Sequence, residues 1–232
     1  MAIDDEYEIV LIKNEIDARL CAKLIADEFA LHNSLSVFIQ STPEKLFDEC
    51  FWPFMINVLD EKLSFLMRHR PTNEIAAVVI ANDLFLECKN HPYDISSPAS
   101  SIPNIDLFSE MLAQFVNHDY DQELKPNIIL SVSVVVTKSK HSGKSLAAHL
   151  SAHTCNYARY TKGFQYALVQ TSNPATRNIY VKKMNGKEIM IVDPATWLWK
   201  KKDDGLSRPF KDYKGEPVVN IFVKLNERTE LI

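Results

Sequence analysis

The turn between a β-patterned segment and a helical segment carries the residues best suited to bind an anion. Residues 127–136 are rich in β-branched side chains, and a helical pattern follows from Gly143 to about Arg159. Backbone N–H groups at the start of a helix favour negative charge, and lysine and serine side chains add cations and a hydroxyl donor. We therefore predict an anion site formed by Lys140, His141, Ser142, Gly143, Lys144 and Ser145.

Two other interpretations of this turn have to be weighed. The lysines could be solvated side chains of an ordinary strand–helix connection, because basic loops are common. The sequence Gly143-Lys144-Ser145 also matches the end of a nucleotide-binding P-loop, but that motif requires a glycine where this chain has Lys138. The spacing excludes the P-loop and leaves the anion site and the plain connection open.

The remaining pattern predicts strands and helices on both sides of this turn. We expect strands at 7–12, 63–67, 75–81, 127–136, 164–170, 188–192 and 218–225. We expect helices at 16–31, 43–59, 105–116, 143–159 and 174–184. In the first helix Leu20, Leu24 and Leu31 recur at helical spacing, and residues 87–103 form the longest predicted loop.

Composition indicates one globular domain over residues 1–232. Hydrophobic residues make up 46% and charged residues 24%, which are ordinary values for a folded protein. A net charge of -4 gives no basic bias toward nucleic acid, no apolar run is long enough to span a membrane, and the acidic N-terminus is unlike a signal peptide. We expect a cytoplasmic monomer or homodimer that binds neither nucleic acid nor a membrane. Four cysteines without a C-x-x-C pair predict reduced thiols and no metal.

Two motifs and the order of the elements resemble the GCN5-related N-acetyltransferase (GNAT) superfamily. Its cofactor motif, Gln/Arg-x-x-Gly-x-Gly/Ala, is similar to residues 140–145, with Lys140 at the first position and Ser145 at the last. A second motif, Asn-x-x-Ala-x-x-x-Tyr-x-Lys, is similar to residues 173–182, with Thr176 at the alanine. Residues 103–136 also resemble the insect-type arylalkylamine N-acetyltransferases, and the resemblance covers roughly residues 7–225.

The resemblance implies a fold, an activity and a cofactor site. The GNAT fold is an α/β (α+β) fold with a mixed, mostly antiparallel sheet of about seven strands flanked by helices and a splayed central strand pair. The activity would be an acetyl-CoA-dependent transfer of an acetyl group directly to a primary amine, such as an arylalkylamine or another small amine, with no metal. Beyond the turn, the cofactor would contact Val134, Val135, Val136, Asn173 and Tyr180.

Four residues are candidates for the chemistry itself: Tyr180, Ser131, Ser133 and His32. Tyr180 matches the family tyrosine that can act as general acid, with a tyrosine packed at a helix surface as the alternative. Ser131 and Ser133 could line a water path on the central strand or be ordinary sheet residues. Strict alternation would place both serines on the face opposite Val132 and Val134.

The general base is the open question. Insect-type relatives carry a glutamate after the first helix, and Asn33 stands at that place here. An amide cannot accept a proton, so His32 or a water chain would have to serve, although a helix dipole also explains a histidine at a helix end. The departure at Asn33 leaves open both an enzyme and a regulatory module that binds acyl-CoA with weak or no turnover. A protein-interaction domain without a cofactor is a third possibility, which rests on the purely structural interpretations of the two motifs.

Overall fold

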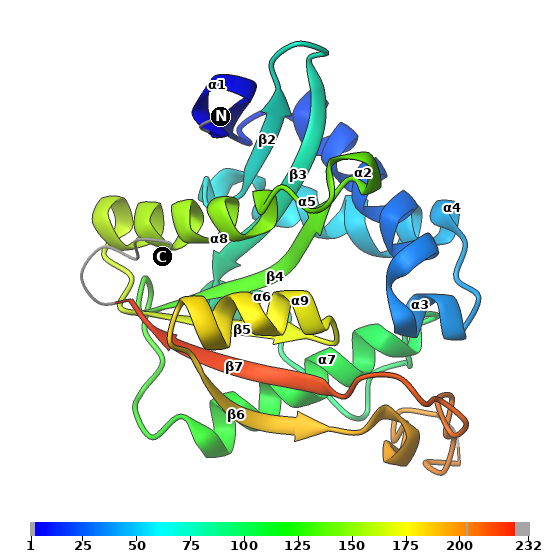
Figure 1. Cartoon of the computed structure of the whole chain (residues 1–232). Coiled ribbons are helices and arrows are strands. Elements are labelled where there is room, and N and C mark those ends of the chain that lie inside the picture. The colour runs from blue at the N-terminus through cyan, green and yellow to red at the C-terminus, as the bar shows by residue number, and fades with distance from the viewer. Residues whose placement is uncertain (1–2, 203, 226–232) are drawn as a thin grey trace.

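A seven-stranded sheet forms the centre of the protein (Figure 1). A computed structural model describes residues 3–202 and 204–225. The strand order is β1-β2-β3-β4-β5-β7-β6, and β4 and β5 form the one parallel pair in it. The strands are β1 (Tyr7–Leu11), β2 (Phe65–His69), β3 (Glu74–Asp83), β4 (Ile129–Thr137), β5 (Tyr166–Thr171), β6 (Lys187–Val192) and β7 (Val218–Lys224). The expected mixed, mostly antiparallel sheet is confirmed.

Helices cover both faces of this sheet. The α-helices are α1 (Ile3–Glu6), α2 (Glu15–His32), α3 (Ser34–Phe38), α4 (Pro43–Leu46), α5 (Trp52–Val58), α6 (Leu84–Asn90), α7 (Pro103–Gln114), α8 (Leu146–Tyr157) and α9 (Pro174–Asn178). Shorter 3-10 or π-helical segments are η1 (Phe47–Phe51), η2 (Leu59–Glu61), η3 (Phe115–Asp119), η4 (Ser139–His141), η5 (Ala158–Lys162), η6 (Ile179–Lys183) and η7 (Pro194–Thr196). One hydrophobic cluster joins α8 and η6 to the sheet, and a second joins α2, α4 and α5 to the other face. Among the residues described, no helix is long and apolar enough to cross a bilayer.

The central strands β4 and β5 separate part of the way along their length. They pair in parallel from Ile129↔Tyr166 to Val132↔Val169. Beyond that point β4 continues along β3, whereas β5 continues along β7 (Figure 1). The splayed central pair predicted from the resemblance is therefore present, and we call the point after Val132 the divergence of β4 and β5.

A β-bulge at this divergence changes which side chains of β4 face which helices. The register joins Ile80 to Val134 and Ala81 to Val132, so Ser133 has no residue opposite it on β3. Val132 packs in the cluster with α8, whereas Val134 packs in the cluster with α2 and α5. The expectation that Val132 and Val134 share a face is wrong, because one inserted residue reverses the alternation.

Two local expectations differ from the structure. The segment predicted as a loop at 87–103 begins inside α6, which starts after the capping residue Asp83, whose Oδ1 accepts the Phe85 N–H at 3.0 Å. In α2, Leu20 and Leu31 are exposed, and the buried side consists mostly of small residues. Small side chains let the helix approach the sheet closely, so size rather than hydrophobicity selected the buried stripe. Its members are Ala18, Cys21, Ala22, Ile25 and Ala26.

Candidate active site

The turn between β4 and α8 leaves the start of α8 without a cap. Ser145 precedes the helix with φ 60°, and its side chain makes no capping hydrogen bond. His149 N–H bonds to the Ser145 carbonyl, and within the described chain no acceptor is found for the amides of residues 146–148. Gly143 has φ +80° and open space where a Cβ would stand. The turn therefore offers unpaired N–H groups and room for a close approach, which suits an anion.

The lysines around this turn are already paired with carboxylates. Lys138 and Lys140 both contact Glu74 of β3, the first at 3.0 Å. Lys144 donates to Glu6 at 2.8 Å and to the Tyr7 hydroxyl at 2.9 Å. Hydrogen bonds from Lys140 and Lys138 hold the pKa of Glu74 far below its usual range. Any anion bound here would compete with Glu6 and Glu74 for the ammonium groups.

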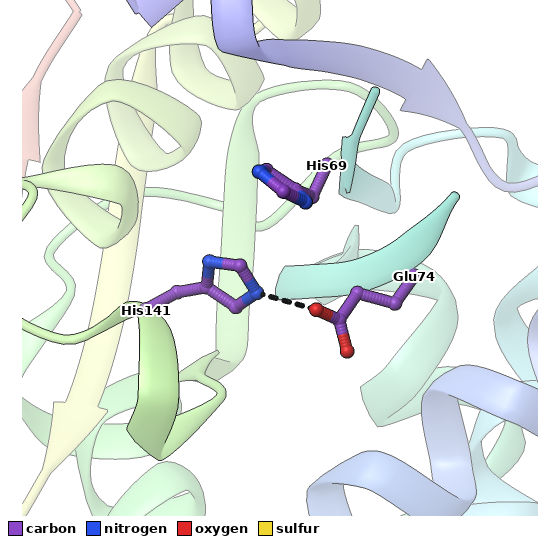
Figure 2. Close-up of side chains that lie close together, drawn as sticks. All are labelled: His69, Glu74 and His141. Carbon is purple, nitrogen blue, oxygen red and sulfur yellow. Dashed lines mark hydrogen bonds and ion pairs between the residues drawn. The ribbon is translucent and has the colours of Figure 1, made fainter. Parts of the chain in front are cut away.

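His141 anchors the turn to the sheet (Figure 2). Its buried ring shares a hydrogen bond with the Tyr7 hydroxyl at 2.9 Å through Nδ1 and with Glu74 at 3.0 Å through Nε2. His69 lies beside it, with ring centroids 5.0 Å apart. Because His141 joins β1 and β3 to the turn, it has a structural role whether or not it touches a cofactor.

The three side chains in Figure 2 also deserve comparison with metal sites. Ligand atoms of His69, Glu74 and His141 lie within 4.8 Å of one another, and two histidines with a glutamate are a known zinc ligand set. Their donor atoms are engaged, however. His69 hydrogen bonds to Thr72 and Glu6, and a cation would have to displace two ammonium groups from Glu74. The arrangement is that of a hydrogen-bonded charge network.

A second polar network lies at the divergence of β4 and β5. Ser133 Oγ donates to Asn82 Oδ1 at 3.2 Å and lies 3.3 Å from Ser131 Oγ. Asn82 Nδ2 donates to Glu87 Oε2 at 2.8 Å. Ser131 and Asn82 are buried, whereas Ser133 and Glu87 are partly buried. The two predicted serines are thus linked to a carboxylate on α6.

The free edge of β4 follows directly after these serines. In the described part of the chain, β3 is the strand that pairs with residues 134–137, and the edge toward β5 carries no strand partner there. Val134 and Val136 are buried on the side of α2, and Val135 packs in the cluster with α8. The backbone at Val134, Val135 and Val136 is therefore placed to pair with an extended ligand, and that role stays a prediction.

Tyr180 lies in η6 and is completely buried against α8. Its hydroxyl has no hydrogen-bond partner, and neither does Ser151 Oγ on α8. Burial raises the pKa of Tyr180 well above 10, so the hydroxyl stays protonated. Nearby Asn173 caps α9, and its Oδ1 accepts the amides of Ala175 at 2.8 Å and Thr176 at 3.2 Å. The cap explains Asn173, and the buried hydroxyl of Tyr180 lies beside Ser151 without a hydrogen bond of good geometry.

His32 and Asn33 open onto a cavity of about 350 Å³. Its lining includes His32, Asn33, Ser34, Asn173, Lys214 and Glu216. His32 Nε2 lies 2.9 Å from Ser139 Oγ and 3.6 Å from Glu28. Asn33 caps α3 by accepting the Ser36 N–H at 3.0 Å. The structure brings His32 and Asn173 to one cavity, whereas Tyr180 does not line this cavity and packs against α8.

Sequence reasoning missed the residues that complete both networks. Asn82 bonds to Ser133 and to Glu87, and Glu6, Tyr7 and Glu74 hold the predicted turn. Asn82-Asp83 at the end of an otherwise apolar strand was the signal available for the first network. The network of Glu6, Tyr7 and Glu74 around the turn had no signal in the sequence, because isolated glutamates and a tyrosine are common on any protein surface.

The fold is that of the GCN5-related N-acetyltransferases. Neither protein-family models nor curated protein sequences give a match, so the likeness is one of structure. The C-terminal condensation domain of Ebony, solved with beta-alanyl-dopamine, superposes with a TM-score of 0.75 at 17% identity, covering 94% of this chain and 99% of that one.

Two similar structures come from named insects. A putative arylalkylamine N-acetyltransferase 7 from the yellow fever mosquito Aedes aegypti gives a TM-score of 0.68 at 12% identity, covering 95% of this chain and 88% of its own. The Drosophila melanogaster polyamine N-acetyltransferase gives 0.62 at 14% identity, covering 94% and 100%. At these identities the comparisons establish the fold.

Proposed function

We propose that this protein transfers an acyl group from a coenzyme A thioester directly to a primary amine. Acetyl-CoA is the donor, and an arylalkylamine or another small amine is the acceptor. The observation that carries the proposal is the uncapped start of α8, which directly follows the strand that parts from β5. Similar structures named for arylalkylamine and polyamine acetylation, and one holding beta-alanyl-dopamine, support an amine acceptor.

The residues present fit such a thioester donor. Amides of residues 146–148, with Gly143 and Lys144, would hold the pyrophosphate. The free edge of β4 from Val134 to Val136 would pair with the amides of the pantetheine arm, as one strand does with another. Tyr180 keeps its proton. It would donate this proton to sulfur as the thiolate leaves, a role that requires the buried hydroxyl to become accessible when the donor binds. His141, Ser142 and Asn173 would contribute contacts around the phosphates.

Binding of acetyl-CoA is tested by thermal unfolding. A ligand that binds the native state alone, at 100 times its Kd, raises the free energy of unfolding by about 2.7 kcal/mol. For a chain of this size each kcal/mol raises the melting temperature by about 2–4 °C, so we expect a shift of about 5–10 °C. Lys144→Ala should reduce the shift. Glu6→Gln should increase it at low salt, because it releases Lys144 from its carboxylate.

The matched control is Lys23→Ala, which removes a lysine from the Lys23–Asp27 pair on α2, away from the turn. This variant should keep the shift of the original protein. Absence of a shift at saturating acetyl-CoA would refute the proposed donor site. If Lys144→Ala shows the same melting-temperature shift as the original protein, the phosphates bind elsewhere.

A regulatory module that holds an acyl-CoA without turnover is the second candidate. The observation that favours it is Asn33, which caps α3 at the place of the relatives' glutamate. The two candidates differ in thiol release when amines are supplied to the acetyl-CoA complex. Turnover with any amine of a broad panel would exclude the module, and binding without turnover would exclude the enzyme.

We also propose a cytosolic location. All four cysteines are free thiols, and burial raises the pKa of the Cys50, Cys88 and Cys155 thiols to about 12. Unpaired cysteines persist in a reducing compartment, which is also where a pool of acyl-CoA would be available to this fold. Fractionation of cells that produce the protein would test the location.

A further inference from the structure

A hydrogen-bonded serine joins the end of α2 to the turn after β4. Ser139 N–H donates to Glu28 Oε1 at 3.0 Å, and the Ser139 hydroxyl donates to Glu28 Oε2 at 2.5 Å. The same hydroxyl oxygen lies 2.9 Å from His32 Nε2. Glu28 and His32 are one turn apart on α2. A residue of the candidate donor turn therefore contacts two side chains of α2 at once.

These contacts fix which nitrogen of His32 carries the proton. A carboxylate can only accept, so the single hydroxyl proton of Ser139 is committed to Glu28. Ser139 Oγ is then an acceptor toward His32, and Nε2 must be the protonated nitrogen of the neutral ring. Nδ1 keeps its lone pair, and no hydrogen-bond partner for it is found in the part of the chain that the structure describes. The neutral ring can therefore take up a proton at Nδ1.

His32 lies at the open end of the divergence of β4 and β5. Ser139, which holds the ring, follows the end of β4. Asn173, which lines the 350 Å³ cavity together with His32, follows the end of β5. The ring thus contacts the turn after one of the parting strands and shares a cavity with the turn after the other. An amine in this cavity would face a thioester held along the free edge of β4.

We infer that Ser139 and Glu28 are positioning residues that hold His32 in the Nε2–H tautomer, so that Nδ1 accepts the proton of an amine in this cavity. This inference rests on the proposed function, and it names a base where Asn33 cannot serve. Glu28 lies 3.6 Å from Nε2, and His32 stands in the last turn of α2. The carboxylate and the helix dipole both favour the imidazolium that forms. The His32 side chain is 60% exposed, so solvent can take the proton away afterwards.

The protons of the reaction balance along this path. An ammonium carries three protons and cannot attack until one has passed to Nδ1 of His32. The N–C bond then forms, and the C–S bond breaks. A second nitrogen proton is released as the leaving thiolate gains one, and the third remains in the amide. His32 returns its proton to solvent, whereas Ser139 keeps its own proton throughout.

The other charged groups around His32 make different contacts. The two lysines that flank Ser139 in the chain both contact Glu74, and they are Lys138 and Lys140. Lys214 and Glu216 line the cavity with His32, and both are exposed. Glu216 is the one carboxylate among the lining residues, which makes it the rival proton acceptor.

Glu28→Gln tests the positioning role through the tautomer. The Ser139 N–H needs an oxygen opposite it, so the amide group of the glutamine would face the Ser139 hydroxyl as a donor. The hydroxyl would then donate to His32 Nε2, and the ring proton would move to Nδ1. Nitrogen NMR of the isotope-labelled histidine, recorded where the ring is neutral, distinguishes the two forms. We expect Nε2–H in the original protein and Nδ1–H in Glu28→Gln.

Thiol release at saturating acetyl-CoA and amine, measured over a range of pH, tests the consequence for the reaction. We expect His32→Gln to lower kcat about 100-fold or more and to remove the loss of rate toward acid pH. Glu28→Gln should lower kcat about tenfold or more, because the lone pair has moved to the wrong nitrogen. Ser139→Ala should also lower the rate, and Ser139→Thr should recover it because threonine restores the hydroxyl. The melting-temperature shift caused by acetyl-CoA should stay unchanged in His32→Gln and Glu28→Gln.

Asp27→Asn is the matched control, because it removes the neighbouring carboxylate of α2, which pairs with Lys23. It should keep the rate, the acid limb and the Nε2–H tautomer. The inference is overturned while the enzyme stands if the original ring carries its proton on Nδ1, or if Glu28→Gln keeps the original rate. Loss of the acid limb in Glu216→Gln instead of His32→Gln would overturn it as well. If the original protein binds acetyl-CoA but releases no thiol with any amine, the proposed function itself fails and no proton is left for His32 to accept.

Discussion

Tyr180→Phe separates the stability of this protein from its activity. The substitution deletes one oxygen atom that is fully buried and has no hydrogen-bond partner. A buried polar group without a partner costs about 1–3 kcal/mol, so its removal should stabilise the free protein by about that amount. At about 2–4 °C per kcal/mol for a chain of this size, the melting temperature should rise by several degrees.

The same substitution should slow acyl transfer if the hydroxyl serves the leaving sulfur. Thermal unfolding without ligand and thiol release with saturating acetyl-CoA measure the two effects on one variant. Ser151→Ala is a companion variant, because Ser151 Oγ is also buried without a hydrogen bond of good geometry, lies beside the Tyr180 hydroxyl and is not a candidate proton donor. It should leave the rate of acyl transfer unchanged, whereas Tyr180→Phe should lower it. A lower melting temperature for Tyr180→Phe would refute the reasoning, since it would mean that the hydroxyl has a partner in solution.

Two further predictions concern stability. Burial raises the pKa of Glu61 from 4.5 to about 7, so its protonated form favours folding below pH 4.5 and that benefit is lost as pH rises through 7. At 1.36 kcal/mol per pKa unit the full effect is about 3 kcal/mol, which partial exposure reduces to about 1–2 kcal/mol. Urea unfolding should therefore show Glu61→Gln gaining stability over the original protein at pH 8.5 but not at pH 4.5, and an equal difference at both would contradict the cause given. Asn33→Ala should cost about 1 kcal/mol by removing the cap of α3, whereas Asn33→Asp should keep it; equal melting temperatures for the two variants would show that the cap contributes nothing.

The sequence by itself determined the elements around the candidate site. The β-branched run at 127–136 can be buried on both faces, and the glycine and helical pattern after it require a turn and a helix. The local pattern therefore located β4, the turn and α8 within a few residues, and the second motif did the same for α9. These features depend on neighbours in the sequence, which is why periodicity could find them.

Tertiary structure alone decided the chemistry available at the site. The bulge at Ser133 depends on the register with β3, which no spacing within β4 encodes. Glu74 and Glu6 neutralise the lysines of the turn from strands and helices far away in the sequence. Glu87 is connected to Ser133 through Asn82 because α6 packs against β3 and β4. Partners in a charge network or a hydrogen-bond network are set by distance in space, and a single sequence carries no measure of that distance.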